Sequence, residues 1–166
     1  AWGGAGETGY RLHPSGLRPR IGLRAQFGSG DPDPDDGRTA TFVGPFGRPS
    51  CCADPFWLAP VNALILAPLL SIEPTPHLQV ELKVDFVRRL EHADAIYAFP
   101  PRPYPGSAGR NGNDWFTHAP TLAVTWSPWP ELTVEAYHVS QRVKGPLRAV
   151  GADDGTFTVL SLALRF

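Results

Sequence analysis

The feature that most constrains this chain is a two-residue alternation of apolar and polar side chains. From Leu78 to Phe86 every second residue is apolar, and the residues between are glutamine, glutamate, lysine and aspartate. Successive side chains of a β-strand point to opposite faces, so this pattern predicts a strand with one oily and one charged face. Similar alternation occurs in 17–27, 118–127, 131–140 and 156–166, whereas 60–72 is apolar on both faces.

Long helices are disfavoured throughout the chain. The sequence contains 19 prolines and 17 glycines, both of which are costly inside a helix. The most apolar run, 59–72, is interrupted by Pro60, Asn62 and Pro68, so it is too short to cross a membrane as a helix. The chain is therefore predicted to be all-β, and any crossing of a membrane must be made by strands.

The connections between the predicted strands alternate between short and long. The strands are expected at 17–27, 60–72, 78–89, 118–127, 131–140 and 156–166, with long external loops at 28–57, 91–117 and 141–155. Segments of about ten residues are long enough for tilted strands to cross a bilayer, and outer-membrane barrels have short periplasmic turns and long external loops. We therefore expect an antiparallel up-and-down meander of about six or seven strands, a single partial domain over 1–166, forming the C-terminal part of a transmembrane β-barrel.

Such a sheet is expected to be open. The smallest single-chain barrels have about eight strands, so six or seven leave two unpaired edges. The chain contains no methionine, and residues 1–12 lack the basic and apolar regions of a secretory signal, so we expect a processed product or a fragment. The missing strands would belong to an N-terminal part or, alternatively, to partner chains.

Aromatic residues gather near the predicted strand ends, as in the interfacial girdles of barrels. They are Trp126, Trp129 and Phe166 near the short turns, and Phe27, Phe86, Trp115 and Phe116 near the long loops. The terminal Phe166 also matches the signal by which outer-membrane proteins reach the barrel-assembly machinery. We therefore expect this machinery and outer-membrane lipid as partners.

The alternation also predicts which charged side chains face inward. The inward cations are Arg18, Arg20, Arg24, Lys83, Arg89 and Arg165, and the inward acids are Glu81, Asp85, Glu131 and Glu135. Arginine pairs well with carboxylates, and several weak cationic sites suit the passage of a polyanion. The alternative is that these acids and bases pair across strands and stabilise a polar interior.

Several longer stretches resemble the alginate export family of outer-membrane proteins. They are "FGSGDPDPDDGRTATF" (27–42), "ADPFWLAPVNAL" (53–64), the turns "PTP" (74–76) and "PWP" (128–130), and "GADDGTFTVLSLALRF" (151–166), so the resemblance spans about 17–166. It implies a closed barrel of many more than six strands with a basic lumen. It also implies a secretion pore in the bacterial outer membrane for an anionic polysaccharide, a uronate polymer such as alginate.

An acidic segment provides the only metal candidate. Asp31, Asp33 and Asp35 have the spacing of a calcium loop, but Gly37 comes one position late and Phe42 replaces the closing glutamate, which excludes an EF-hand. A weak calcium site remains open beside the alternative of a solvated acidic turn.

No catalytic centre is predicted. The five histidines lack metal-ligand spacing and no nucleophile set can be assembled, so we expect no enzyme and no cofactor. A net charge of -1 without a basic cluster argues against nucleic acid. Cys51 and Cys52 are adjacent, and we expect a loop disulfide or no functional role for them.

Three functions remain open from the sequence. The first is an exopolysaccharide export pore, and the second is a general diffusion porin, which shares the architecture without anion preference. The third is a soluble carbohydrate-binding β-domain, which would need to bury its oily strand faces against a second sheet.

Overall fold

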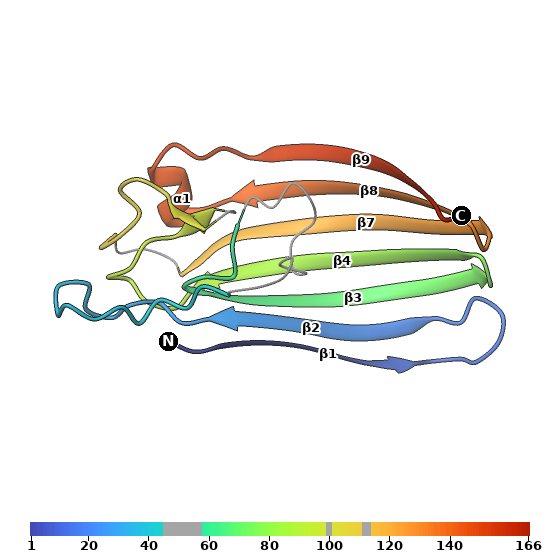
Figure 1. The fold of residues 1–166 in the computed structure, drawn as a ribbon, viewed down its shortest axis with the longest axis horizontal. Coiled ribbons are helices and arrows are strands. Elements are labelled where there is room, and N and C mark those ends of the chain that lie inside the picture. The colour runs from blue at the N-terminus through green and yellow to red at the C-terminus, as the bar shows by residue number, and fades with distance from the viewer. Residues whose placement is uncertain (45–57, 99–100, 111–113) are drawn as a thin grey trace.

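The computed structural model describes residues 1–44, 58–98, 101–110 and 114–166. Its main element is a seven-stranded antiparallel sheet in which each strand pairs with its neighbours along the chain, in the order β1-β2-β3-β4-β7-β8-β9 (Figure 1). The strands are β1 (Gly3–Arg11), β2 (Arg20–Gly28), β3 (Ala63–Thr75), β4 (Leu78–Arg89), β7 (Trp115–Trp129), β8 (Leu132–Val143) and β9 (Gly155–Leu164). The predicted all-β, antiparallel up-and-down meander is confirmed.

Short elements lie in the connections at one end of this sheet. The hairpin of β5 (Tyr97–Ala98) and β6 (Arg102–Pro103) lies between β4 and β7, and helix α1 (Gly145–Ala149) lies between β8 and β9. Among the described residues, the structure contains no helix with the length and hydropathy needed to span a membrane.

Strand β1 lies outside the ranges expected for strands. It pairs with β2 along its whole length, from Gly3 opposite Gly28 to Arg11 opposite Arg20. At the four positions opposite the apolar side chains of β2 it has two glycines, a threonine and a tyrosine, so hydrophobic periodicity does not reveal it. Backbone pairing with β2, and not the side-chain pattern, therefore defines β1 as a strand.

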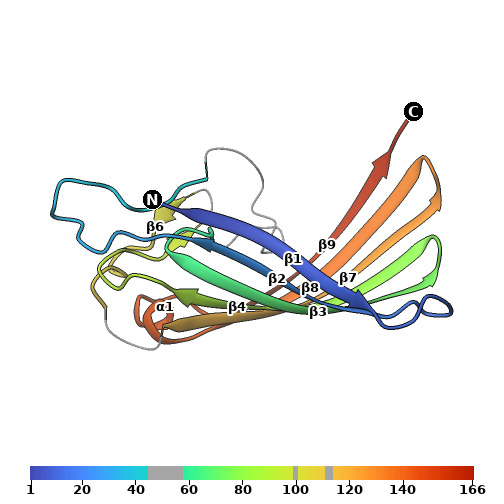
Figure 2. The same cartoon turned by 90° about the horizontal axis from the view of Figure 1, so that it is seen from below.

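The two faces of the sheet differ as the alternation predicts. The outward side chains are apolar and exposed, and include Ile21, Leu23, Leu70, Leu82, Phe86, Leu122, Trp126, Leu160 and Leu162. The inward face carries buried polar side chains, among them Gln26, Ser71, Lys83, Asp85, Thr121 and Gln141. The sheet is curled into a trough (Figure 2). We assign the buried polar side chains to its concave side, because neighbouring strands shield the inside of a curved sheet more than the outside. Strand β3 is apolar on both faces, because Ile65, Ala67 and Leu69 are buried on the inner one.

One of the expected girdle aromatics lies elsewhere. Phe86, Trp115 and Trp126 are exposed on the outer face, but Phe116 is only 1% exposed. The register slips between Val87 and Arg88, which leaves Phe116 unpaired against β4 and turned inward. The expectation that Phe116 belongs to the outer girdle is wrong, because a β-bulge breaks the parity of β7 at this residue.

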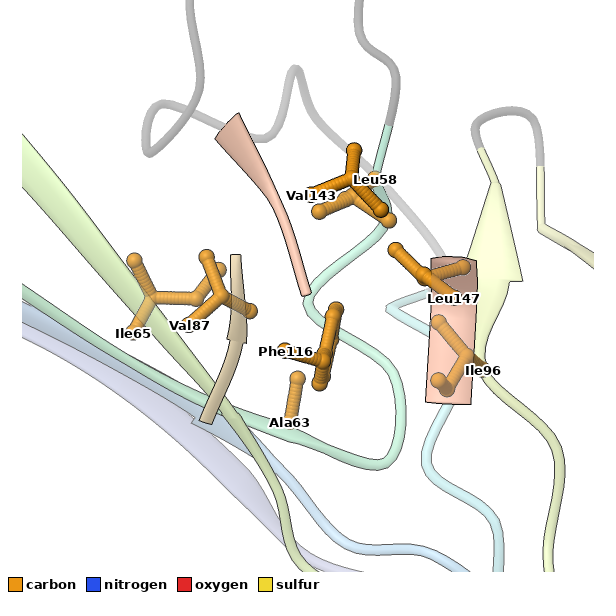
Figure 3. Close-up of a cluster of buried hydrophobic side chains, with 8 residues drawn as sticks. All are labelled: Leu58, Ala63, Ile65, Val87, Ile96, Phe116, Val143 and Leu147. Atoms are coloured by element: carbon orange, nitrogen blue, oxygen red, sulfur yellow. The ribbon is translucent and has the colours of Figure 1, made fainter. Parts of the chain in front are cut away.

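The inward Phe116 belongs to a hydrophobic core at the long-loop end. The core consists of Leu58, Ala63, Ile65, Val87, Ile96, Phe116, Val143 and Leu147 (Figure 3). It joins inner-face side chains of β3, β4 and β8 to α1 and to the segment before β5. The loops therefore fold over the inner face at this end and cover it.

Two prolines interrupt the backbone pairing at the middle of the sheet. Pairing of β3 with β4 skips Ala67 and Pro68, and pairing of β7 with β8 skips Ala119 and Pro120, with no change of register on either side. Proline has no N–H to donate to a neighbouring strand. Both prolines lie at one level of the sheet, because Pro120 is opposite Val84 and Val84 falls opposite Pro68 by the flanking register.

Candidate functional site

The uncovered part of the inner face is the candidate site, and cross-strand rows define its geometry. Residues directly opposite one another in antiparallel strands share a face. One such row runs from Arg20 through Ser71, Glu81 and Ala123 to Tyr137. The alternation thus brings side chains from five strands together at one height.

Two predicted cations share one acid on this face. Arg20 Nη2 lies 2.7 Å from Glu7 Oε1, and Arg24 Nη2 lies 2.8 Å from Glu7 Oε2. Gly9 makes room for the first contact, because a Cβ there would lie 2.6 Å from the Arg20 guanidinium. Glu7 on β1 belongs to this charged cluster, and the sequence did not reveal it because its strand was not expected.

A second acid pairs with two arginines at the short-turn rim. Glu73 Oε1 lies 3.2 Å from Arg11 Nη2, and its Oε2 lies 3.4 Å from Arg18 Nη1. These side chains are partly exposed, so each pair contributes only about 0.2–1 kcal/mol. Arg11 and Glu73 were not singled out from the sequence, whereas Arg18 was.

The fourth predicted cation, Lys83, lies in the middle of the face. Its Nζ is 3.0 Å from Asp85 Oδ2, and both side chains are buried. The two residues are two positions apart on β4, so they share the inner face. Leu69 and Thr121 flank Lys83 in its row and restrict access to it.

The other carboxylates of the inner face differ from these, because they form no ion pair in the described part of the chain. Among the described residues, no salt bridge involves Glu81, Glu131 or Glu135. Arg165 lies beyond the end of β9, and its backbone N–H donates to the carbonyl of Glu131 at 2.9 Å. It is placed at the short-turn rim and forms no salt bridge within the described part of the chain.

Charge is therefore divided laterally across the inner face. We call β1–β3 and the adjoining turn the arginine side, with Arg11, Arg18, Arg20 and Arg24 against Glu7 and Glu73. We call β4–β9 the carboxylate side, with Lys83 and Arg165 against Glu81, Asp85, Glu131 and Glu135. The first has an excess of cations and the second an excess of acids.

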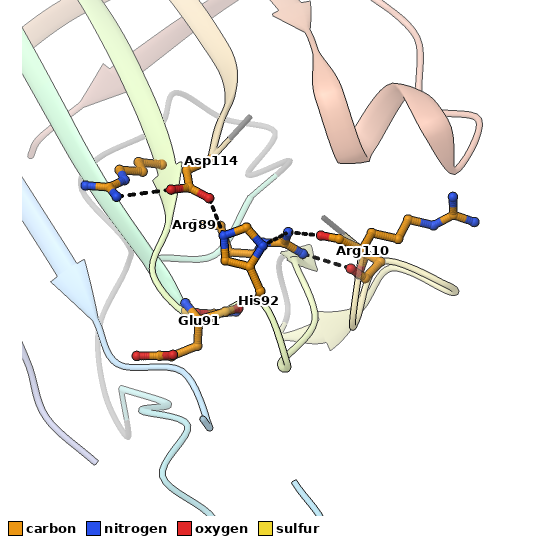
Figure 4. Close-up of polar contacts among 8 residues, drawn as sticks. Arg89, Glu91, His92, Arg110 and Asp114 are labelled. Atoms are coloured by element: carbon orange, nitrogen blue, oxygen red, sulfur yellow. Dashed lines mark hydrogen bonds and ion pairs between the residues drawn. The ribbon is translucent and has the colours of Figure 1, made fainter. Parts of the chain in front are cut away.

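The remaining predicted cation, Arg89, is not open to the inner space. It is 0% exposed, and its Nη1 donates to the carbonyl of Ser107 at 2.9 Å while Nη2 donates to the carbonyl of Arg110 (Figure 4). Its Nη2 also lies 3.1 Å from His92 Nδ1. Because a guanidinium only donates, His92 accepts at Nδ1 and presents Nε2–H to Asp114. Arg89 therefore holds the covering loop instead of facing the open part of the trough.

Asp114 is the anion of this loop network. Burial alone would raise the pKa of Asp114, but the hydrogen bond from Arg88 and the contact with His92 hold this pKa below its ordinary value. The Arg89 backbone N–H also donates to the Asp114 carbonyl at 2.9 Å, so this network holds the residue that precedes β7.

A buried asparagine ties the same loop to the start of β3. Asn62 is 1% exposed, and its side chain donates to the carbonyls of Glu91 and Ala95 and accepts from the Glu91 N–H. Its backbone has a φ of 51°, and Gly30 packs against it so closely that a Cβ there would lie 2.1 Å from Asn62 Oδ1. Sequence reasoning missed this residue, because it falls inside an apolar run.

The acidic segment organises its own loop. Asp31 accepts from the N–H groups of Asp33 and Ala40, and Asp33 accepts from the N–H of Asp35. In the described residues no three His, Cys, Asp or Glu side chains are arranged to hold a metal ion. The carboxylates act as turn-forming acceptors, as in Asx turns.

A second aspartate connects this loop to the β5–β6 hairpin. Asp94 accepts from the Asp31 N–H, the Thr41 hydroxyl and the Tyr97 hydroxyl. Burial, together with the Asp94 carboxylate, raises the pKa of Tyr97 to about 12. Cys51 and Cys52, expected to form a loop disulfide or nothing functional, lie outside the described residues.

Long strands with an exposed apolar outer face and a charged inner face are characteristic of membrane-spanning sheets of the β-barrel class. The alginate export family model matches residues 1–158, and the chain belongs to this family. The family match begins at residue 1, whereas the resemblance of individual sequence stretches begins at about residue 17. The match therefore includes β1. The family is one of outer-membrane polysaccharide export, a transport activity and not an enzymatic one. No curated protein and no solved structure matches the chain.

Proposed function

We propose that this chain forms part of the wall of a pore in the bacterial outer membrane, through which an anionic exopolysaccharide such as alginate is exported. The observation that carries the proposal is the excess of arginine on the arginine side of the inner face. Arg20 and Arg24 share one carboxylate, so together with Glu7 they retain a net positive charge. Guanidinium groups bind carboxylates in a bidentate manner, which suits a uronate chain.

The outer face supports the membrane location. Leu70, Leu82, Leu122 and Leu162 are exposed on the outer face of β3, β4, β7 and β9. Contact of this apolar surface with water is unfavourable, whereas contact with lipid is favourable. We place the short turns on the periplasmic side and the long loops outside, following the rule for barrels. Phe166, at the end of β9, is the residue we assign to recognition by the barrel-assembly machinery.

The sheet edges imply further strands. Within the residues that the structure describes, β1 and β9 each pair on one side only, and lipid cannot satisfy the N–H and C=O groups of a free edge. We propose that further strands pair with both edges and close the barrel. These could come from the same polypeptide or from a partner chain, and cross-linking of cysteines placed on β1 and β9 in the assembled pore distinguishes the two sources.

The experiment that tests the cargo is single-channel recording of the full-length protein in a planar bilayer, with uronate oligomers as blockers. We expect preference for chloride over potassium and block by the oligomers. Joint replacement Arg20→Gln and Arg24→Gln should weaken the block by about tenfold, because two partly exposed pairings with carboxylate are lost. Arg88→Gln is the control, because Arg88 lies opposite Trp115 on the outer face. Cation preference, or block unaffected by the double replacement, would exclude this cargo.

A general diffusion porin is the second candidate, and one observation favours it. The arginine side and the carboxylate side together carry six cations and six acids, so the anion preference of this wall depends on the arginine side alone. A diffusion porin would show little selectivity and no block by oligouronate in the same recordings.

The soluble carbohydrate-binding domain is tested by detergent dependence. The described residues contain no second large sheet that covers the outer face. We therefore expect aggregation when detergent is removed, and a monodisperse protein in plain buffer would restore the soluble alternative.

A further inference from the structure

A hollow of about 110 Å³ lies on the inner face over β7, on the carboxylate side. It is lined by Gln79 and Glu81 of β4 and by Ala123 and Thr125 of β7. The register explains it, because Ala123 stands between the longer side chains of Glu81 and Tyr137 in one cross-strand row. A methyl group between two long side chains leaves a gap above the strand.

The chemistry around the hollow is that of hydroxyl recognition. Its lining offers an amide, a carboxylate and a hydroxyl, and no cation. Glu81 and Glu135 both lack a salt bridge among the described residues. Such carboxylates accept hydrogen bonds from hydroxyl groups, but they repel a carboxylate of the cargo.

The two strands beyond the hollow carry an aromatic pair, which is not part of the lining itself. Tyr137 lies opposite Ala123, and Phe157 packs against Tyr137 edge to face, with ring centroids 5.9 Å apart and an interplanar angle of 87°. A sugar ring presents both hydroxyls and apolar C–H groups. Polar acceptors beside aromatic side chains match both kinds of group.

We propose that this hollow is a subsite for one pyranose ring of the exported polysaccharide, bound through its hydroxyls, with the carboxylates of the polymer turned toward the arginine side. This inference rests on the proposed export function and adds the orientation of the cargo. Arg20 and Glu81 lie in one row with Ser71 between them. Two strand spacings amount to about 10 Å, a span that one sugar ring and its substituents can bridge.

The test uses the full-length protein in a planar bilayer and two matched blockers. One is a uronate oligomer, and the other is the same oligomer after reduction of each carboxyl to a hydroxymethyl group. Both should block the pore, the reduced oligomer through the hollow alone. Ala123→Leu fills the hollow and should weaken block by both oligomers by at least about tenfold, as expected when extra methylene groups enter a fitted site.

Ala119→Leu is the matched control for Ala123→Leu. Ala119 is on the same strand and face, four residues away, and lies opposite Asp85 outside the hollow. It should leave block by either oligomer within about twofold of the unmodified pore. Gln79→Ala, at an exposed position, removes one hydrogen-bonding side chain without filling space and should weaken block by both oligomers by about threefold to tenfold.

The outcomes separate this inference from the proposed function. Block by uronate but not by the reduced oligomer, or equal effects of Ala123→Leu and Ala119→Leu, would overturn the subsite and leave the export pore standing. Absence of block by either oligomer would overturn the proposed function and the subsite with it. Loss of block by both oligomers in Ala123→Leu and Gln79→Ala, with Ala119→Leu unaffected, supports the subsite.

Discussion

The two ends of the inner face differ in what covers them. At the long-loop end, Ile65, Val87 and Arg89 are 1%, 1% and 0% exposed, because the loops and α1 pack on them. At the short-turn end, Gln79 and Glu135 are exposed on the same face of the same sheet. The comparison shows that the alternation along a strand predicts which face a side chain is on, whereas the loops determine whether that side chain is accessible to a ligand. Replacements at the first end should change stability, and replacements at the second should change conduction.

The largest effect is expected at the centre of the covered end. Phe116→Ala removes a fully buried ring and should lower the free energy of unfolding by about 3–5 kcal/mol, measured by urea unfolding in lipid vesicles. Trp115→Ala is the control, because this neighbour points outward and is 38% exposed. Equal losses for both would show that the loops do not form a core on the inner face.

A smaller loss of stability is expected at the arginine beneath the loop. Arg89→Met leaves the carbonyls of Ser107 and Arg110 without this donor and should cost about 2–3 kcal/mol. Limited proteolysis of the intact pore should then cut the connection between β4 and β7 faster. Arg88→Met removes only a surface pair with Asp114, so the protease should cut the connection in this variant at the original rate. If Arg89→Met changed uronate block and left proteolysis unaltered, Arg89 would belong with the ligand-facing cations.

At the open end the expected effect is on selectivity. Glu7→Gln removes the carboxylate shared by Arg20 and Arg24 and should raise the permeability ratio of chloride to potassium by about twofold to fivefold. Reversal potentials in a salt gradient measure this ratio. Glu135→Gln, on the carboxylate side, is the partner variant and should shift the ratio in the same direction, because it removes an unpaired anion. An unchanged ratio in both would mean that the inner face does not line the conducting path.

The smallest effect is expected where α1 joins β9. The Val143 N–H donates to Asp154 and, with Arg142 and Arg148, holds the pKa of this carboxyl below its ordinary value near 3.8. A carboxyl whose pKa is lower in the folded state contributes stability above its ordinary pKa and loses it as the pH falls through the folded value. Acidification below about pH 4 should therefore loosen the 144–154 connection slightly, as seen by proteolysis. Asp154→Asn should abolish this pH dependence. Asp153→Asn, which changes the exposed neighbouring residue, should leave it in place.

The fold was predictable wherever side-chain pattern defines a strand. Leu78–Phe86 alternates clearly, and β4 occupies Leu78–Arg89. The glycine-rich β1 gives no such pattern, so Glu7 and its pairing with two arginines could not be foreseen. Phe116 was misplaced because a single bulged residue reverses the parity of a strand, and no local sequence signal marks it.

The site was predictable in composition but not in accessibility. The alternation pattern predicts that Arg24, Lys83 and Arg89 lie on one face. Their partners differ, however, because contacts between residues distant in the sequence determine most of them. Arg24 meets Glu7 from a neighbouring strand, Lys83 meets Asp85 two residues away, and Arg89 meets carbonyls of a loop. Only the second of these contacts is local enough for spacing to suggest it.

The two prolines at mid-height make the wall easiest to bend along two lines, between β3 and β4 and between β7 and β8. Missing donors at Pro68 and Pro120 weaken the pairing there, while β2 pairs with β3 and β4 with β7 without a break at this level. The first line separates the arginine side from the hollow over β7. A slight change in curvature along it would alter the distance from Arg20 and Arg24 to Ala123, so the width of the passage is tied to how far the wall is curled.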